Sequence, residues 1–302
     1  MRTLIATLLL ACLAGCAQSL PSDGREASSF SGAPLVRPEP DAARRPRLEQ
    51  ELGDARVEWA RDGTEAASIR LGRACAALGR YQDAVAAYTA GLERHRDSHR
   101  LRRHRGHRLI TLHRLDDAAR DFRDAWALAK ERPDALESAD GSSTDKSAIL
   151  YHYGLTEYLR AEYARADDAF ALRRSLRGMK DENVVSAAHW HYWALRRSGR
   201  NAEAARVIEP IRDGMDVQEN KSYYTLCRLY RGLTPLADVE RQLISEDGKL
   251  NVGLAYGVAC WRRFELDDEP GARALLERIT ATGNWTAFGH VAAEADLARW
   301  PR

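Results

Sequence analysis

The feature that most constrains this chain is a repeat of 34 residues that begins near residue 65. Thirty-four residues after residues 65–98, small and aromatic residues recur in the same register. A further set follows after a polar insert at 133–146. Repeats of this length predict pairs of helices that stack on their neighbours and bury one continuous core. The residues at repeated offsets are Leu71, Gly72, Cys75, Leu78, Gly79, Tyr81, Ala84, Tyr88 and Leu92, then Gly106, Ala118, Phe122 and Ala125, then Tyr153, Gly154, Tyr163, Ala166 and Phe170.

This spacing resembles the tetratricopeptide repeat (TPR), a hairpin of two antiparallel helices. Small residues at offsets 8 and 20 let the two helices approach closely, and Gly79 allows the turn between them. A degenerate unit is expected near 219–249. The expected fold is therefore all-α, a TPR-type α-solenoid of about five to six helix pairs. The later units are marked by Leu195, Gly199, Ala204 and Ile208, and by Tyr256, Gly257 and Ala272.

The composition allows such a core and gives little sign of nucleic-acid binding. Hydrophobic residues make up 44% of the chain and charged residues 30%, which excludes wholesale disorder. The 46 basic and 44 acidic residues leave a net charge of only +2. We expect a leading helix at 47–60 within a segment 47–64, TPR units one to four at 65–213, and degenerate and C-terminal units at 214–302.

The first sixteen residues predict a location in the bacterial envelope. A positive start precedes an apolar stretch at 3–14, which has the length of a signal-peptide core and is too short to span a bilayer. The sequence LAGC at 13–16 resembles the bacterial lipobox, whose cysteine carries lipid, and Cys12 is a poorer second candidate. Because Ala17 follows, the enterobacterial sorting rule implies the outer membrane. We expect a signal peptide at 1–15 and a periplasm-facing lipoprotein whose covalent lipid is on Cys16.

Residues 17–46 are rich in Pro, Ser, Gly and Ala and lack periodicity. Such a segment buries too little apolar surface to offset its ordering entropy. We therefore expect 16–46 to be a lipidated N-terminus and a flexible, disordered tether, which would span roughly 30 Å on average.

In a TPR array the first helices of the pairs line a concave groove. Its basic end and its largely aromatic end together suit an extended peptide that has carboxylates and apolar anchors. If the offsets are misphased by one residue, Tyr151 or Trp193 is instead core between hairpins, and this alternative stays open. The expected groove residues are Arg73, His99, Arg100, Arg103 and His107, followed by Tyr151, Tyr158, His189, Trp193, Arg196 and Arg197.

The most charged stretch is 94–114, with eight arginines, five histidines and one aspartate. It is open to three interpretations: a solvated helix face, an anionic contact to lipid headgroups or an acidic protein surface, or a metal site. The histidine pairs could share a helix face, but the neighbouring cations argue against a divalent ion. We expect no metal.

Signatures of catalysis and of disulfides are weak. The chain has no G-x-S-x-G, H-E-x-x-H, C-x-x-C, P-loop or G-x-G-x-x-G motif. After cleavage at Cys16 the remaining cysteines are Cys75, Cys227 and Cys260, which we interpret as buried thiols rather than as a Cys227–Cys260 disulfide. The expected protein is not an enzyme.

The order of parts resembles the new lipoprotein I (NlpI) family of outer-membrane TPR adaptors. The likeness extends to residues 224–243 (YTLCRLYRGLTPLADVERQL) and 254–299, but the insert 133–146, the arginine-rich second unit and extra residues near Pro270 depart from it. The resemblance implies a non-catalytic, homodimeric scaffold that brings peptidoglycan hydrolases and a periplasmic processing protease together. It also implies that the leading helix takes part in dimer formation.

We therefore expect a membrane-anchored periplasmic scaffold that binds protein or peptide clients, with no nucleic-acid partner. It would act by raising the local concentration of its clients. The alternative within binding proteins is a pilotin-like lipoprotein that assists pilus or secretin assembly. A metal- or histidine-dependent enzyme is a third class, which would need acidic or cysteine ligands near His104 and His107.

Overall fold

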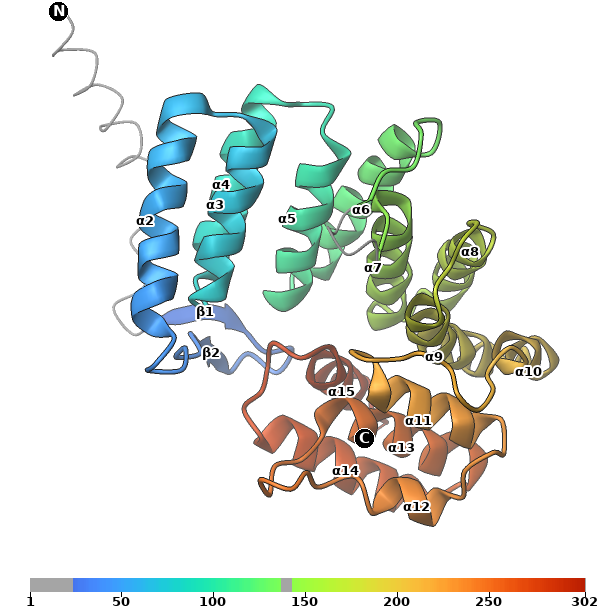
Figure 1. Cartoon of the computed structure of the whole chain (residues 1–302). Helices are drawn as coiled ribbons and strands as arrows, with labels where there is room; N and C mark the ends of the chain where they lie inside the picture. The colour runs from blue at the N-terminus through green and yellow to red at the C-terminus, as the bar shows by residue number, and fades with distance from the viewer. Residues whose placement is uncertain (1–23, 137–142, 302) are drawn as a thin grey trace, which may run out of the picture. The chain divides into compact units, whose positions relative to one another are not determined.

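A computed structural model of the chain describes residues 24–136 and 143–301. The expected signal peptide and the lipidation site Cys16 lie outside the described residues. These residues form fourteen helices and one two-stranded hairpin (Figure 1), which confirms the all-α fold. Contacts between residues divide the chain into two compact units, Met1–Leu128 (unit 1) and Ala129–Arg302 (unit 2).

Unit 1 contains the hairpin and five helices. The first helices of its two repeats are capped 34 residues apart, because the hydroxyls of Thr64 and Ser98 accept hydrogen bonds from the N–H groups of Ala67 (3.1 Å) and Leu101 (2.9 Å). The elements are β1 Arg25–Ser28, β2 Pro34–Val36, α2 Arg45–Asp62, α3 Glu65–Ala77, α4 Tyr81–Arg94, α5 His99–Thr111 and α6 Leu115–Ala129, whose last residue falls in unit 2.

Three helix pairs share the same close contact between a glycine and an aromatic ring. A Cβ atom placed on the glycine would lie within 3 Å of the ring, closer than real Cβ atoms come. The glycine at offset 8 therefore lets the second helix pack directly against the first, as the TPR-like register predicts. The pairs are Gly72 and Tyr88 (2.2 Å), Gly106 and Phe122 (2.8 Å), and Gly154 and Phe170 (2.7 Å).

The leading helix is confirmed, and the flexible tether is corrected for the residues that the structure describes. Helix α2 buries Leu48, Leu52, Ala55 and Trp59 against α3, with bounds within two residues of those expected. Before it, β1 and β2 pair antiparallel, and residues 24–38 pack on unit 1. The composition of this segment did not reveal that α4 would satisfy its polar groups.

Unit 2 contains nine helices among its described residues, and two of them lie at 219–249, where a degenerate unit is expected. They are α7 Asp145–Leu159, α8 Tyr163–Arg174, α9 Asp181–Arg197, α10 Asn201–Ile208, α11 Lys221–Tyr230, α12 Leu236–Glu240, α13 Val252–Glu265, α14 Glu269–Ala281 and α15 Phe288–Ala298. Within the insert, Leu136 and Thr144 form an isolated bridge, and Thr144 caps α7, which therefore takes in the last two insert residues.

The C-terminal helices of unit 2 pack against α7 and α9, the first helices of its earlier pairs. Helix α9 contacts α7, α8, α10 and α11, while α15 packs on α13, α14 and α7. Every residue from 185 to 195 of α9 is buried as a result. The first helices of unit 2 are thus covered by later parts of the same unit.

Candidate functional site

Later helices of unit 2 cover α7 and α9, so part of the predicted groove does not exist. Tyr158, His189 and Trp193 are 1%, 0% and 0% exposed, so their side chains cannot meet a partner. The hydroxyl of Tyr158 lies 2.7 Å from that of Tyr256 on α13, and the Trp193 indole N–H donates to the hydroxyl of Tyr230 on α11 at 2.8 Å. The prediction that these three residues line a groove is wrong, and the core interpretation of Trp193 is correct.

The remaining predicted residues of unit 2 are engaged inside it. The half-buried ring of Tyr151 lies under the guanidinium of Arg173, 5.0 Å from ring centroid to Cζ. Arg196 pairs with Glu265 of α13 at 2.5 Å. Arg197 forms a buried ion pair with Asp296 of α15, also at 2.5 Å. The aromatic half of the groove is therefore the interior of unit 2.

The basic half of the groove lies on α3 and α5 of unit 1. Arg73 is exposed, His99, Arg100 and His107 are partly exposed, and Arg103 is 7% exposed. The 13 residues of α5, HRLRRHRGHRLIT, include five arginines and three histidines and no carboxylate.

Arg108 is a residue of this basic surface that the offsets did not predict. Its guanidinium lies over the ring of Tyr81, 5.6 Å from the centroid. Burial lowers the pKa of Arg108, and the neighbours that raise it are the phenols of Tyr88 and Tyr81 rather than a carboxylate. Burial in turn raises the pKa of Tyr88 to about 12, against the positive charges of Arg108, Arg103 and Arg73, which lower it. Three guanidinium groups from α3 and α5 therefore act on one buried hydroxyl.

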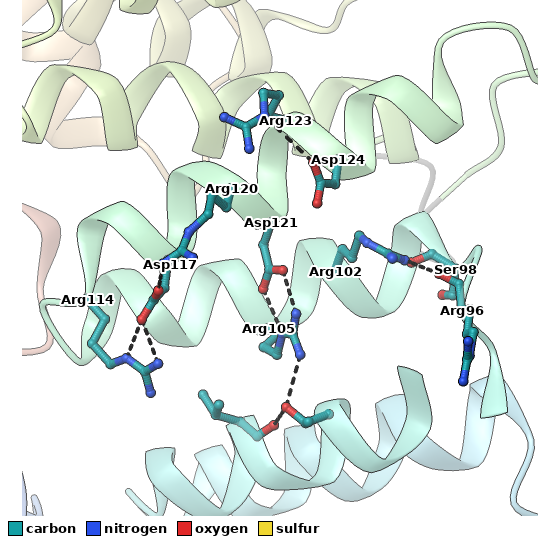
Figure 2. Close-up of polar contacts among 12 residues, drawn as sticks. Arg96, Ser98, Arg102, Arg105, Arg114, Asp117, Arg120, Asp121, Arg123 and Asp124 are labelled. Carbon is teal, nitrogen blue, oxygen red and sulfur yellow. Dashed lines mark hydrogen bonds and ion pairs between the residues drawn. The ribbon is translucent and has the colours of Figure 1, made fainter. Parts of the chain in front are cut away.

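One charge of α5, that of Arg105, is neutralised by α6 (Figure 2). The guanidinium of Arg105 binds both carboxylate oxygens of Asp121, at 2.7 and 2.8 Å, and also donates to the hydroxyl of Thr89 on α4. The carboxylate of Asp117 pairs with Arg114, which directly precedes α6, and with Arg120 of α6 itself. Arg105 is thus neutralised on the α6-facing side of α5, whereas Arg73 of α3 and Arg103 and Arg108 of α5 lie around the buried hydroxyl of Tyr88.

Two neighbouring cavities in unit 1 are lined by the face of α4 that carries Val85 and Thr89. No sequence pattern predicted them. The larger, about 920 Å³, lies between β1, the small side chains of α4 and the turn at His113. The smaller, about 410 Å³, lies between α4 and α6 and shares Val85, Thr89 and Arg114 with the larger one. The Arg105–Asp121 pair and the pairs of Asp117 with Arg114 and Arg120, all drawn in Figure 2, line the smaller cavity.

The cysteines and the potential metal ligands of the described residues bear on which chemistry the chain could perform. Cys75, Cys227 and Cys260 are buried free thiols, as expected, and burial raises the pKa of each. In residues 24–136 and 143–301 no group of three His, Cys, Asp or Glu side chains could hold a metal ion. Over the same residues, no helix combines the length and apolar character that crossing a bilayer requires.

Comparisons with known proteins give a distant structural likeness. No protein-family model matches the chain, and no curated protein matches it. The chain is similar to the crystal structure of a tetratricopeptide repeat protein from Parabacteroides merdae ATCC 43184, with a TM-score of 0.49 and 14% identity. That alignment covers 83% of this chain and 94% of the other.

Proposed function

We propose that the chain is a non-catalytic lipoprotein scaffold of the bacterial envelope. Cys16 would carry the lipid that anchors it in the outer membrane, with the helical units in the periplasm and two copies forming a homodimer. The paired TPR-like helices support a role in binding other proteins, and the lipobox supports the anchor. A scaffold of this kind raises the local concentration of its clients and needs no chemistry of its own.

The client surface in this proposal is the α3–α5 face, defined as Arg73, Arg100, Arg103, His107 and Arg108. The observation that carries it is that Arg73, Arg103 and Arg108 surround the buried hydroxyl of Tyr88, on helices of which α5 has no carboxylate of its own. Guanidinium groups bind carboxylates with two parallel hydrogen bonds, so this face suits an extended acidic segment of a client. The client classes are peptidoglycan hydrolases or a periplasmic processing protease.

The test compares two charge reversals on neighbouring helices. The full chain, recovered from detergent-solubilised envelope, is used as bait, and bound proteins are identified by mass spectrometry. Arg100→Glu with Arg103→Glu should abolish client binding and leave helicity unchanged. Arg120→Glu with Arg123→Glu makes the same charge change on exposed positions of α6 and should bind clients like the wild type.

Each outcome has a definite meaning. Hydrolases or a protease that depend on the α3–α5 face support the scaffold, whereas pilus or secretin subunits would favour the pilotin-like alternative. Equal binding by both double variants would contradict the α3–α5 face. The mass of the N-terminal peptide separately tests lipidation, and Cys16→Ser should move the protein into the soluble fraction.

A further inference from the structure

The hairpin β1–β2 is bound to one edge of unit 1. We call this the turn edge, defined by Gly79 in the α3–α4 turn and His113 in the α5–α6 turn. In the first turn of α4, Gln82 donates its backbone N–H to the carboxylate of Glu26 (2.9 Å) and its side-chain amide to the Glu26 carbonyl (2.6 Å). At the α5–α6 turn, the ring of Phe30 stacks on His113 with centroids 4.9 Å apart. The hairpin thus contacts both turns.

These contacts make the hairpin part of the folded unit. The N-cap residue of α4, Arg80, makes no capping hydrogen bond, so the Glu26 carboxylate caps this helix in its place. Glu26 is 2% exposed and is also paired with Arg37 at 2.8 Å. Just after strand β2, the carbonyl oxygen of Pro38 lies 2.6 Å from where a Cβ atom on residue 79 would be, so only glycine fits at position 79.

Because the hairpin belongs to the folded unit 1, fewer residues separate that unit from the lipid anchor at Cys16 than a free tether up to residue 46 would provide. Only residues 17–23 separate Cys16 from Gly24, and Gly24 is two residues, or about 7 Å, from Glu26. The eight steps from Cys16 to Gly24 reach at most about 28 Å when fully extended. A free tether up to residue 46 would reach about 100 Å on the same basis.

We propose that the turn edge of unit 1 is the surface that faces the lipid bilayer, and that the α4–α5 turn at Asp97 points away from it. This placement rests on the lipid anchor of the proposed function. Three cations of the turn edge have carboxylate partners, Arg37 with Glu26, Arg80 with Asp83 and Arg114 with Asp117. The tether, and not attraction to anionic lipid, therefore holds this edge at the membrane.

The test measures the distance from each edge to a bilayer. The processed chain, residues 16–302, is coupled through the Cys16 thiol to a maleimide lipid in phosphatidylcholine vesicles. The other three cysteines are at most 4% exposed and remain unmodified. An azide-bearing amino acid replaces Arg114 or Asp97 and carries a donor fluorophore, with the acceptor in the headgroup region.

Energy transfer should be roughly twofold higher from position 114 than from position 97, because a helix of 13 residues separates the two edges by roughly 20 Å. A Gly-Ser linker of about 20 residues between Asp23 and Gly24 should abolish this difference by lengthening the tether. Glu26→Ala, which releases the hairpin, should reduce the difference. Arg45→Ala removes only the exposed pair with Glu39 and should preserve it.

Equal transfer from the two positions in the wild type would overturn the proposal. A difference that survives the linker insertion would also overturn it, since surface affinity would then orient the protein. Anionic lipid in the vesicles should leave the ratio unchanged. Because the maleimide supplies the anchor, these results do not depend on lipidation in the cell, which the mass of the N-terminal peptide reports separately.

Discussion

Among single residues, His189 shows how burial sets the charge of a side chain. Its ring stacks on Tyr223 with centroids 4.5 Å apart, and its Nδ1 lies 3.0 Å from the hydroxyl of Tyr230. Burial lowers the pKa of His189 from the ordinary 6.5 to about 3. The imidazole is therefore neutral in the folded protein at physiological pH, and it is core, although the sequence alone suggested that it lines a groove.

The buried imidazole predicts a loss of stability in mild acid. The stabilising contribution is complete above the unfolded pKa of 6.5 and decreases as the pH falls toward 3, because only the unfolded histidine takes up a proton. Between pH 7 and pH 5 this group should remove about 2 kcal/mol from the free energy of unfolding. Urea unfolding at both pH values should show a smaller loss for His189→Gln by about that amount. Equal losses in the two proteins would refute the assignment of the pH dependence to His189.

At the scale of helices, the glycine at offset 8 sets the distance within a pair. In α5, Gly106→Ala would place a Cβ atom 2.8 Å from Cζ of Phe122, and we expect it to lower the free energy of unfolding by about 1–3 kcal/mol. The matched control is Gly53→Ala in α2, where nothing lies within 4 Å. Because alanine favours a helix over glycine, the control should raise stability by about 0.5–1 kcal/mol.

Chemical denaturation of the two alanine variants measures both effects. Phe122→Leu in the Gly106→Ala background should recover part of the loss, since the smaller side chain leaves room for the added methyl group. Loss of stability at both glycines, or no recovery, would contradict the close approach as the cause.

At the scale of the whole molecule, a buried ion pair holds α15 on the early helices of unit 2. Asp296 accepts hydrogen bonds from Arg197 of α9 and from Tyr256 of α13. Burial acts to raise the pKa of Asp296, but the charge and hydrogen bonds of Arg197 outweigh it and the pKa is lowered. The carboxylate is therefore ionised in the folded unit and balances a guanidinium that is equally buried.

Asp296→Asn should destabilise unit 2 by about 3 kcal/mol, because Arg197 is left buried without its counter-charge. In hydrogen exchange, amides of α9, α13 and α15 should then exchange roughly 100-fold faster, while those of α3 and α5 keep their wild-type rates. Asp238→Asn breaks an exposed pair with Arg241 in the same unit and should change neither set. Equal acceleration in both units would contradict their separate cores.

The predictable part of this protein was the part encoded over short distances along the chain. The 34-residue register and the leading helix depend on residues within one or two helices of each other. The periodicity of small and aromatic residues thus identifies the helix pairs, because a glycine and a ring at fixed offsets must meet once both helices form. The basic composition of α5 is likewise visible in the sequence.

Tertiary structure alone decided which of these surfaces is available. Tyr158 and Trp193 have groove offsets, but α11 and α13, which follow tens of residues later, cover them. The hairpin reads as a polar linker because the groups that satisfy Glu26 belong to α4, more than fifty residues away. The periodicity of apolar residues shows which face of a helix is apolar. Whether that face is buried inside the unit depends on which other parts of the chain pack against it. For that reason the sequence determined the helical repeat, and the fold determined that the aromatic residues form core while Arg73 of α3 stays exposed and Arg100 of α5 stays partly exposed.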